Sequence, residues 1–88
     1  MNTFDPTLYF ITDSTGLSEK DFLYKVECAL DGGVTLMQLR EKDRTTREYL
    51  HLANEVHSIA RRYNVPLIID DRVDVALATD AEGVHVGQ

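Results

Sequence analysis

The chain has 88 residues, with nine Lys and Arg against fifteen Asp and Glu, a formal net charge of -6 and 43% hydrophobic residues. This length suits one small domain, and the acidic balance argues against nucleic-acid binding through bulk charge. No apolar stretch approaches a membrane span, and a single cysteine allows no internal disulfide, so we expect a cytoplasmic protein that does not bind a membrane.

The first half of the chain predicts two strands separated by a helix. Aromatic and branched residues over 8–12 predict a strand, and their nearly continuous apolar character is typical of a parallel strand covered on both faces. A helix should begin near Ser18, which can cap it, and end at the glycine pair 32–33, with at least one glycine left-handed. We expect Cys28 to pack within this helix. The apolar run over 34–39 predicts the second strand.

A longer helix follows a short turn. Thr45 and Glu48 match the Thr-x-x-Glu capping box, and apolar residues then recur at helical spacing as far as Tyr63. His51 and His57 lie off this apolar stripe. We therefore expect both histidines at the solvated surface rather than in a metal site.

The remaining elements complete an alternating order of strands and helices. Residues 67–69 predict a third strand, residues 73–77 a short helix and residues 83–87 a brief fourth strand. This alternation indicates an α/β fold in which parallel strands are joined by right-handed helical crossovers. Polar residues follow the strands, where ligands bind in both barrels and open α/β sheets.

The segment after the second strand contains the first candidate site. Gln38, Arg40 and Lys42 share one parity, so on a strand their side chains would point to one face. An amide and two cations can bind an anion, because Arg40 can hold two phosphate oxygens and Lys42 adds a point charge. The same residues could simply be the end of a buried strand reaching water, and this strand alone leaves both interpretations open.

Asp70 and Asp71, at the end of the third strand, form the second candidate site. Adjacent strand residues point opposite ways, so we expect one of the two in the site, unless the turn changes their directions. A carboxylate beside Arg40 and Lys42 suits Mg²⁺ bridging to a diphosphate. The alternative is a structural role at the start of the next helix, where the helix dipole favours negative charge.

Three segments together resemble the thiamine phosphate synthase family. They are GVTLMQLREK at 33–42, PLIIDDRVDVALA at 66–78 and DAEGVHVGQ at 80–88, and LYFITD at 8–13 fits as well. The resemblance implies a (β/α)8 TIM-barrel enzyme of thiamine biosynthesis. Such an enzyme joins hydroxymethylpyrimidine diphosphate to thiazole phosphate, forms thiamine phosphate and releases diphosphate.

The resemblance also implies roles for individual residues. Gln38, Arg40 and Lys42 would hold the pyrimidine diphosphate, with Glu41 in the same binding segment, and Asp71 would ligate Mg²⁺. Loss of diphosphate from the methylene carbon would leave a cation that the thiazole nitrogen captures. Arg40, Lys42 and Mg²⁺ would then stabilise the charge that develops on the leaving group.

Two residues fit the family pattern less directly. Asp70 stands where the family commonly has an Asn that touches the pyrimidine, so this chain lacks an amide donor and gains a charge there. Asp70 remains a candidate substrate-binding residue. His85 lies in a family motif whose ring can face the barrel interior.

Four strands are half of a (β/α)8 barrel, which typically needs about 250 residues. We therefore expect residues 1–88 to form one domain, the N-terminal part of a longer barrel. Its second Mg²⁺ carboxylate and thiazole phosphate site would lie beyond residue 88, so we expect this chain alone to be inactive. Its unpaired sheet edges lead us to expect a homo-oligomer. The alternatives are a thiazole tautomerase-like barrel and a non-catalytic half-barrel that self-associates.

Overall fold

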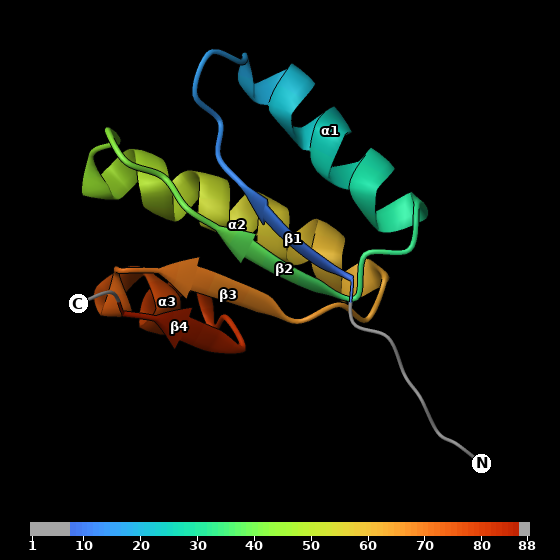
Figure 1. The fold of residues 1–88 in the computed structure, drawn as a ribbon. Coiled ribbons are helices and arrows are strands. Elements are labelled where there is room, and N and C mark those ends of the chain that lie inside the picture. Colours follow the sequence, from blue (N-terminus) through green and yellow to red (C-terminus); the bar gives the residue numbers. More distant parts are fainter. Residues whose placement is uncertain (1–7, 87–88) are drawn as a thin grey trace.

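The computed structural model describes residues 8–86, and within them it has the predicted alternation of strands and helices (Figure 1). The elements are β1 (Tyr9–Thr12), α1 (Glu19–Asp31), β2 (Leu36–Leu39), α2 (Thr46–Arg62), β3 (Leu67–Asp70), α3 (Val73–Thr79) and β4 (Gly83–His85). The last two residues of the three-part sequence pattern, 87–88, lie outside the described residues. No helix among those described is long and apolar enough to cross a membrane.

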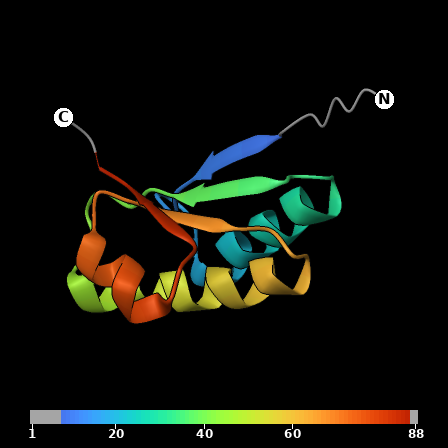
Figure 2. The same cartoon turned by 90° about the horizontal axis from the view of Figure 1, so that it is seen from below.

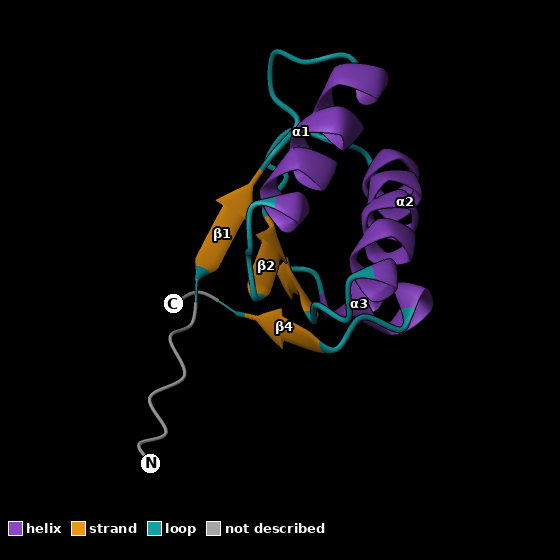
Figure 3. Cartoon of the chain, turned by 90° about the vertical axis from the view of Figure 1, so that its right-hand side faces the viewer, coloured by secondary structure: helices purple, strands orange, loops and turns teal. Residues whose placement is uncertain are grey.

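The strands form one parallel sheet in the sequential order β1-β2-β3-β4. All three helices lie on one face of this sheet, as Figures 2 and 3 show. A doubly wound sheet would carry helices on both faces and would reverse its strand order. Sequential strands with helices on one side are instead the arrangement of a barrel wall. The prediction of an α/β fold with parallel strands is thus confirmed.

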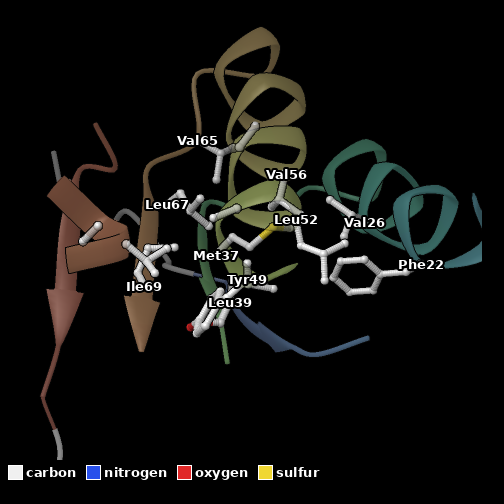
Figure 4. Close-up of a cluster of buried hydrophobic side chains, with 14 of the residues drawn as sticks. Phe22, Val26, Met37, Leu39, Tyr49, Leu52, Val56, Val65, Leu67 and Ile69 are labelled. Carbon is white, nitrogen blue, oxygen red and sulfur yellow. The ribbon is translucent and has the colours of Figure 1, made fainter. Parts of the chain in front are cut away.

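The hydrophobic core lies between the sheet and the helices (Figure 4). Met37, Leu39, Leu67 and Ile69 point from β2 and β3 toward the helices and are fully buried. The helices contribute apolar residues at helical spacing, which are Phe22, Val26, Leu30, Leu52, Ala53, Val56 and Ala60. This alternation of side chains on the strands assigns one face of the sheet to the core.

The opposite side of the sheet, here called the open face, is not covered in the described part of the chain. Tyr9 and Ile11 of β1 are 46% and 52% exposed there. The expectation that the first strand is covered on both faces was therefore wrong. Its apolar side chains face two directions, but helices pack against only one of them.

The predicted helix boundaries are confirmed by their caps. Ser18 Oγ accepts the backbone N–H of Asp21 at 3.1 Å, and Gly33, just beyond the end of α1, has the expected left-handed conformation with φ +104°. Thr45 and Glu48 form the reciprocal capping box, with contacts of 3.0 and 3.1 Å. Such caps satisfy backbone N–H groups that the first turn of a helix leaves unpaired.

Two predictions of burial were wrong, one because of helix geometry and the other because of packing between helices. Cys28 is exposed, because it follows Val26 by two residues and so lies about 200° around α1 from that core residue. His57 is buried, whereas His51 is exposed as expected. The ring of His57 is covered because α3 packs beside α2, and its Nε2 lies 3.0 Å from Glu82 Oε2.

Tyr49 ties the ends of β2 and β3 together, and its hydroxyl group is expected to contribute to stability. The Tyr49 Oη atom lies 2.9 Å from the carbonyl oxygen of Leu39 and 3.0 Å from that of Asp70. Tyr49→Phe leaves these acceptors without their donor, so the free energy of unfolding should fall by about 1–3 kcal/mol. Denaturant titration at a fixed protein concentration measures this change. Tyr24→Phe, at a position that is 71% exposed, is the matched control and should have little effect.

The Tyr49 hydroxyl group should also make the stability of the chain depend on pH in the alkaline range. Burial raises the pKa of Tyr49 from 10.0 to about 12. Between these values the unfolded chain loses the proton while the folded chain keeps it, so this group's contribution to stability should decline as the pH rises from 10 towards 12. Tyr49→Phe should remove that part of the alkaline loss. Equal denaturation midpoints for Tyr49→Phe and wild type at neutral pH would contradict the proposed role of this hydroxyl group.

Candidate functional site

A hollow of about 590 Å³ lies on the open face of the sheet. It is lined by Tyr9, Ile11, Gln38, Arg40, Asp70, Asp71 and His85, which come from all four strands or the positions directly after them. We call it the open-face hollow. Four of the predicted site residues therefore meet in one place, as expected for residues at the carboxyl ends of parallel strands.

Gln38 is held within the open-face hollow by a neighbour on β1. Its side-chain Nε2 donates a hydrogen bond to the hydroxyl oxygen of Tyr9, and the residue is only 4% exposed. The strand register explains this contact, because Gln38 pairs with Ile11 and Tyr9 has the same parity as Ile11. The orientation of the Gln38 amide is thus set before any ligand binds.

Asp70 links two residues that line the open-face hollow. Its Oδ2 lies 3.6 Å from Nε of Arg40, and its Oδ1 lies 2.9 Å from Nδ1 of His85. The Asp70 side chain is 18% exposed, whereas those of Arg40 and His85 are 52% and 60% exposed. An exposed ion pair of this kind is weak, so Arg40 can turn from Asp70 to an incoming anion at little cost.

Asp71 enters the same hollow because the chain turns immediately after β3. Its backbone is left-handed, with φ +65°, and its N–H donates to the carbonyl oxygen of His85 at 2.6 Å. This conformation ends the alternation of a strand, so Asp70 and Asp71 both line the hollow. Strand alternation alone led us to expect only one of them in the site, unless the turn changed their directions. The turn does change them, so the expectation of a single carboxylate was wrong.

Lys42 lies in an adjoining hollow of about 360 Å³, which shares Arg40, Asp70 and Asp71 with the first. We call it the second hollow. Its other lining residues are Glu41, Arg44, Tyr49 and Arg72. Gln38 and Lys42 thus line two different hollows, and Arg40 lines both.

Arg44 and Arg72 were missed as site residues because neither lies on a strand. Arg72 donates from Nη2 to Thr46 Oγ1 at 2.7 Å and to Asp74 Oδ2 at 2.8 Å, and its guanidinium carbon lies 5.8 Å from the ring centre of Tyr49. The available signal in the sequence was that both are basic residues close to the predicted motifs, Arg44 after Lys42 and Arg72 after Asp71. Together with Arg40 and Lys42 they place four basic residues around the second hollow.

Glu41 differs from its neighbours in the predicted binding segment. Its side chain is 1% exposed, and both of its carboxylate oxygens accept hydrogen bonds from Ser14. Among the described residues, no group of three or more His, Cys, Asp and Glu side chains is arranged to hold a metal ion. Asp71 is exposed, lines both hollows and is not part of such a group.

Known proteins share sequence with nearly the whole chain. A family model described as thiamine monophosphate synthase matches residues 8–88. A thiamine-phosphate synthase from Caldanaerobacter subterraneus subsp. tengcongensis is 55% identical over 87 residues, covering 99% of this chain and 41% of the relative. A thiamine biosynthetic bifunctional enzyme from Saccharomyces cerevisiae is 55% identical over 85 residues, covering 96% of this chain and 16% of the relative.

A solved structure supports the fold as well. The thiamine phosphate pyrophosphorylase from Pyrococcus furiosus superposes with a TM-score of 0.80 at 42% sequence identity, covering 89% of this chain and 37% of that one. This chain spans about two fifths of the length of such relatives. The family model and the relatives confirm the resemblance seen in the three sequence segments, and the chain belongs to the thiamine monophosphate synthase family.

Proposed function

We propose that the chain forms the pyrimidine diphosphate part of a thiamine phosphate synthase. The observation that carries this proposal is the meeting of Arg40, Asp70 and Asp71 in the open-face hollow, with Lys42 beside them. Cations and a carboxylate suited to Mg²⁺ are the groups that a diphosphate ester requires. Relatives named thiamine-phosphate synthase share about half of the chain's residues.

The proposed reaction transfers the hydroxymethylpyrimidine group from its diphosphate to thiazole phosphate. The bond between the methylene carbon and the diphosphate oxygen breaks, and its electron pair leaves with diphosphate. The thiazole nitrogen then donates an electron pair to the methylene carbon, which forms the new carbon–nitrogen bond. Arg40 and Lys42 would stabilise the charge that grows on the leaving oxygen, and the fixed amide of Gln38 would orient the substrate.

The carboxylates present fit a magnesium ion in part. Mg²⁺ prefers oxygen ligands and is commonly held by one or two carboxylates together with substrate phosphates. Asp71 is exposed at the hollow, whereas both oxygens of Asp70 already face Arg40 or His85. Asp71 would therefore hold the ion, which when bound would supply positive charge beside the diphosphate. The pairing of Asp70 also offsets its negative charge, which would otherwise repel the substrate.

A chimeric enzyme provides the direct test. This chain would replace the matching 41% of the Caldanaerobacter relative, with which it is 55% identical. The chimera, incubated with both substrates and Mg²⁺, should release diphosphate and form thiamine phosphate. A folded chimera that binds neither substrate and forms no product would contradict the proposed function.

Asp71→Asn in the chimera should raise the Mg²⁺ concentration needed for half-maximal activity while the fold is retained. The change removes the ligand charge but keeps the side chain's size, and Asn tolerates the left-handed backbone of this position. Asp80→Asn is a matched control, because Asp80 also has a left-handed backbone, with φ +60°, but lies at the end of α3. An Mg²⁺ titration unchanged by Asp71→Asn would leave Asp71 with a structural role only.

A further inference from the structure

A partly buried polar cluster lies beside the predicted cations and is formed by Ser14, Glu41 and Arg44. The backbone N–H of Ser14 donates to Glu41 Oε2 at 2.7 Å, and its hydroxyl group donates to Glu41 Oε1 at 2.8 Å. Arg44 Nη2 donates to Ser14 Oγ at 2.6 Å, and Arg44 Nε lies 3.3 Å from Glu41 Oε1. Ser14 is 1% exposed. We call these three residues the Ser14 cluster.

The Ser14 cluster joins two loops that are distant in sequence. Ser14 follows β1, whereas Glu41 and Arg44 follow β2. The backbone N–H of Arg40 also donates to the carbonyl oxygen of Thr12 at 2.8 Å. The segment that bears Arg40 is therefore attached to the first loop through the main chain and through the Glu41 side chain.

The consecutive residues Arg40 and Glu41 point in different directions, which places the Ser14 cluster next to the site but outside the open-face hollow. Arg40 lines the open-face hollow, and Glu41 points away from it towards Ser14. Ser14 lines neither of the two site hollows and lies instead beside a separate one between the starts of α1 and α2. Ser14 can thus influence a ligand at Arg40 only indirectly, through its contacts with Glu41 and Arg44.

We infer that Ser14 and Glu41 are positioning residues, which hold Arg40 and Lys42 in place to bind the diphosphate. This inference rests on the proposed function. Both Glu41 oxygens already accept hydrogen bonds, so its role is to orient its two cationic neighbours rather than to contact substrate. If the segment that bears Arg40 and Lys42 is ordered before the ligand binds, less conformational entropy is lost on binding. Hydrogen bonds to the Glu41 carboxylate are strong enough to order this segment.

The test uses calorimetric binding of inorganic diphosphate to the chimeric enzyme, with the variants Ser14→Ala and Arg40→Ala and their combination. Ser14→Ala should weaken binding by roughly tenfold, similar to the loss of a group that orients a metal ligand. The same change should have much less effect when Arg40 is already Ala, because its influence acts in large part through Arg40. Glu41→Gln keeps one acceptor oxygen, so its affinity for diphosphate should lie between those of wild type and Ser14→Ala.

A matched control separates positioning from general destabilisation. Thr79→Val removes a buried hydroxyl group that donates to the Val75 carbonyl oxygen in α3. It should lower stability without changing the affinity for diphosphate. The same cycle is also measured as kcat/KM for hydroxymethylpyrimidine diphosphate in the chimera.

The outcomes distinguish this inference from the proposed function. Unchanged affinity in Arg40→Ala would overturn the proposed function and the inference with it. Weaker binding in Arg40→Ala but not in Ser14→Ala would overturn the inference alone. The inference would also be overturned if Ser14→Ala lowered the affinity for diphosphate by the same factor in wild type and in Arg40→Ala. The two residues would then act independently.

Discussion

Arg40→Ala in the chimeric enzyme should lower kcat/KM by roughly 100-fold or more, the effect of losing one preorganised group that stabilises developing charge. The guanidinium group is half exposed at the hollow and only 3.6 Å from the Asp70 carboxylate. Its planar fork can donate to two phosphate oxygens at once. The loss should fall on kcat as well as on KM, because charge on the diphosphate grows as the carbon–oxygen bond breaks.

Arg62→Ala is the matched control for this prediction. Arg62 also forms an exposed ion pair, with Nη2 3.7 Å from Glu27 Oε2, but it joins the outer surfaces of α1 and α2. The control should have nearly wild-type kinetics. Steady-state assays of diphosphate release measure both variants, and a near-wild-type rate for Arg40→Ala would remove this residue from the site.

A polypeptide of these 88 residues should not behave as an active monomer. The open face exposes Tyr9 and Ile11, Val84 of β4 is exposed on the helix side, and the sheet ends at β1 and β4 in the described part of the chain. Apolar surface and unpaired strand edges both favour association. We therefore expect self-association or incomplete folding, together with the absence of synthase activity.

Sedimentation velocity and circular dichroism distinguish these results. If the polypeptide self-associates through its open face, Ile11→Glu should shift it towards the monomer, because an unpaired charge is costly to bury. Leu77→Glu is the matched control, since Leu77 is 78% exposed on α3. A compact monomer that makes thiamine phosphate would contradict the expectation and would require a complete site within these residues.

Much of the secondary structure follows from the sequence because its signals are local. The Ser18 cap and the Thr45–Glu48 capping box act over three residues. The core stripe of α2 repeats every three or four residues and needs no knowledge of other elements. The strand-end motifs likewise predicted that Gln38 and Arg40 lie at one site, and both line the open-face hollow, because parallel strands bring their carboxyl ends to one edge.

Tertiary structure decided which surfaces are covered and which polar groups pair. Helices lie on one side of the sheet, so β1 has an open face although its sequence suggested two buried faces. His57 is buried on the helix α2, against which α3 packs. Asp71 enters the hollow through a turn, and Glu41 pairs with Ser14, 27 positions earlier. These outcomes depend on contacts between distant segments, which local periodicity and capping signals do not encode.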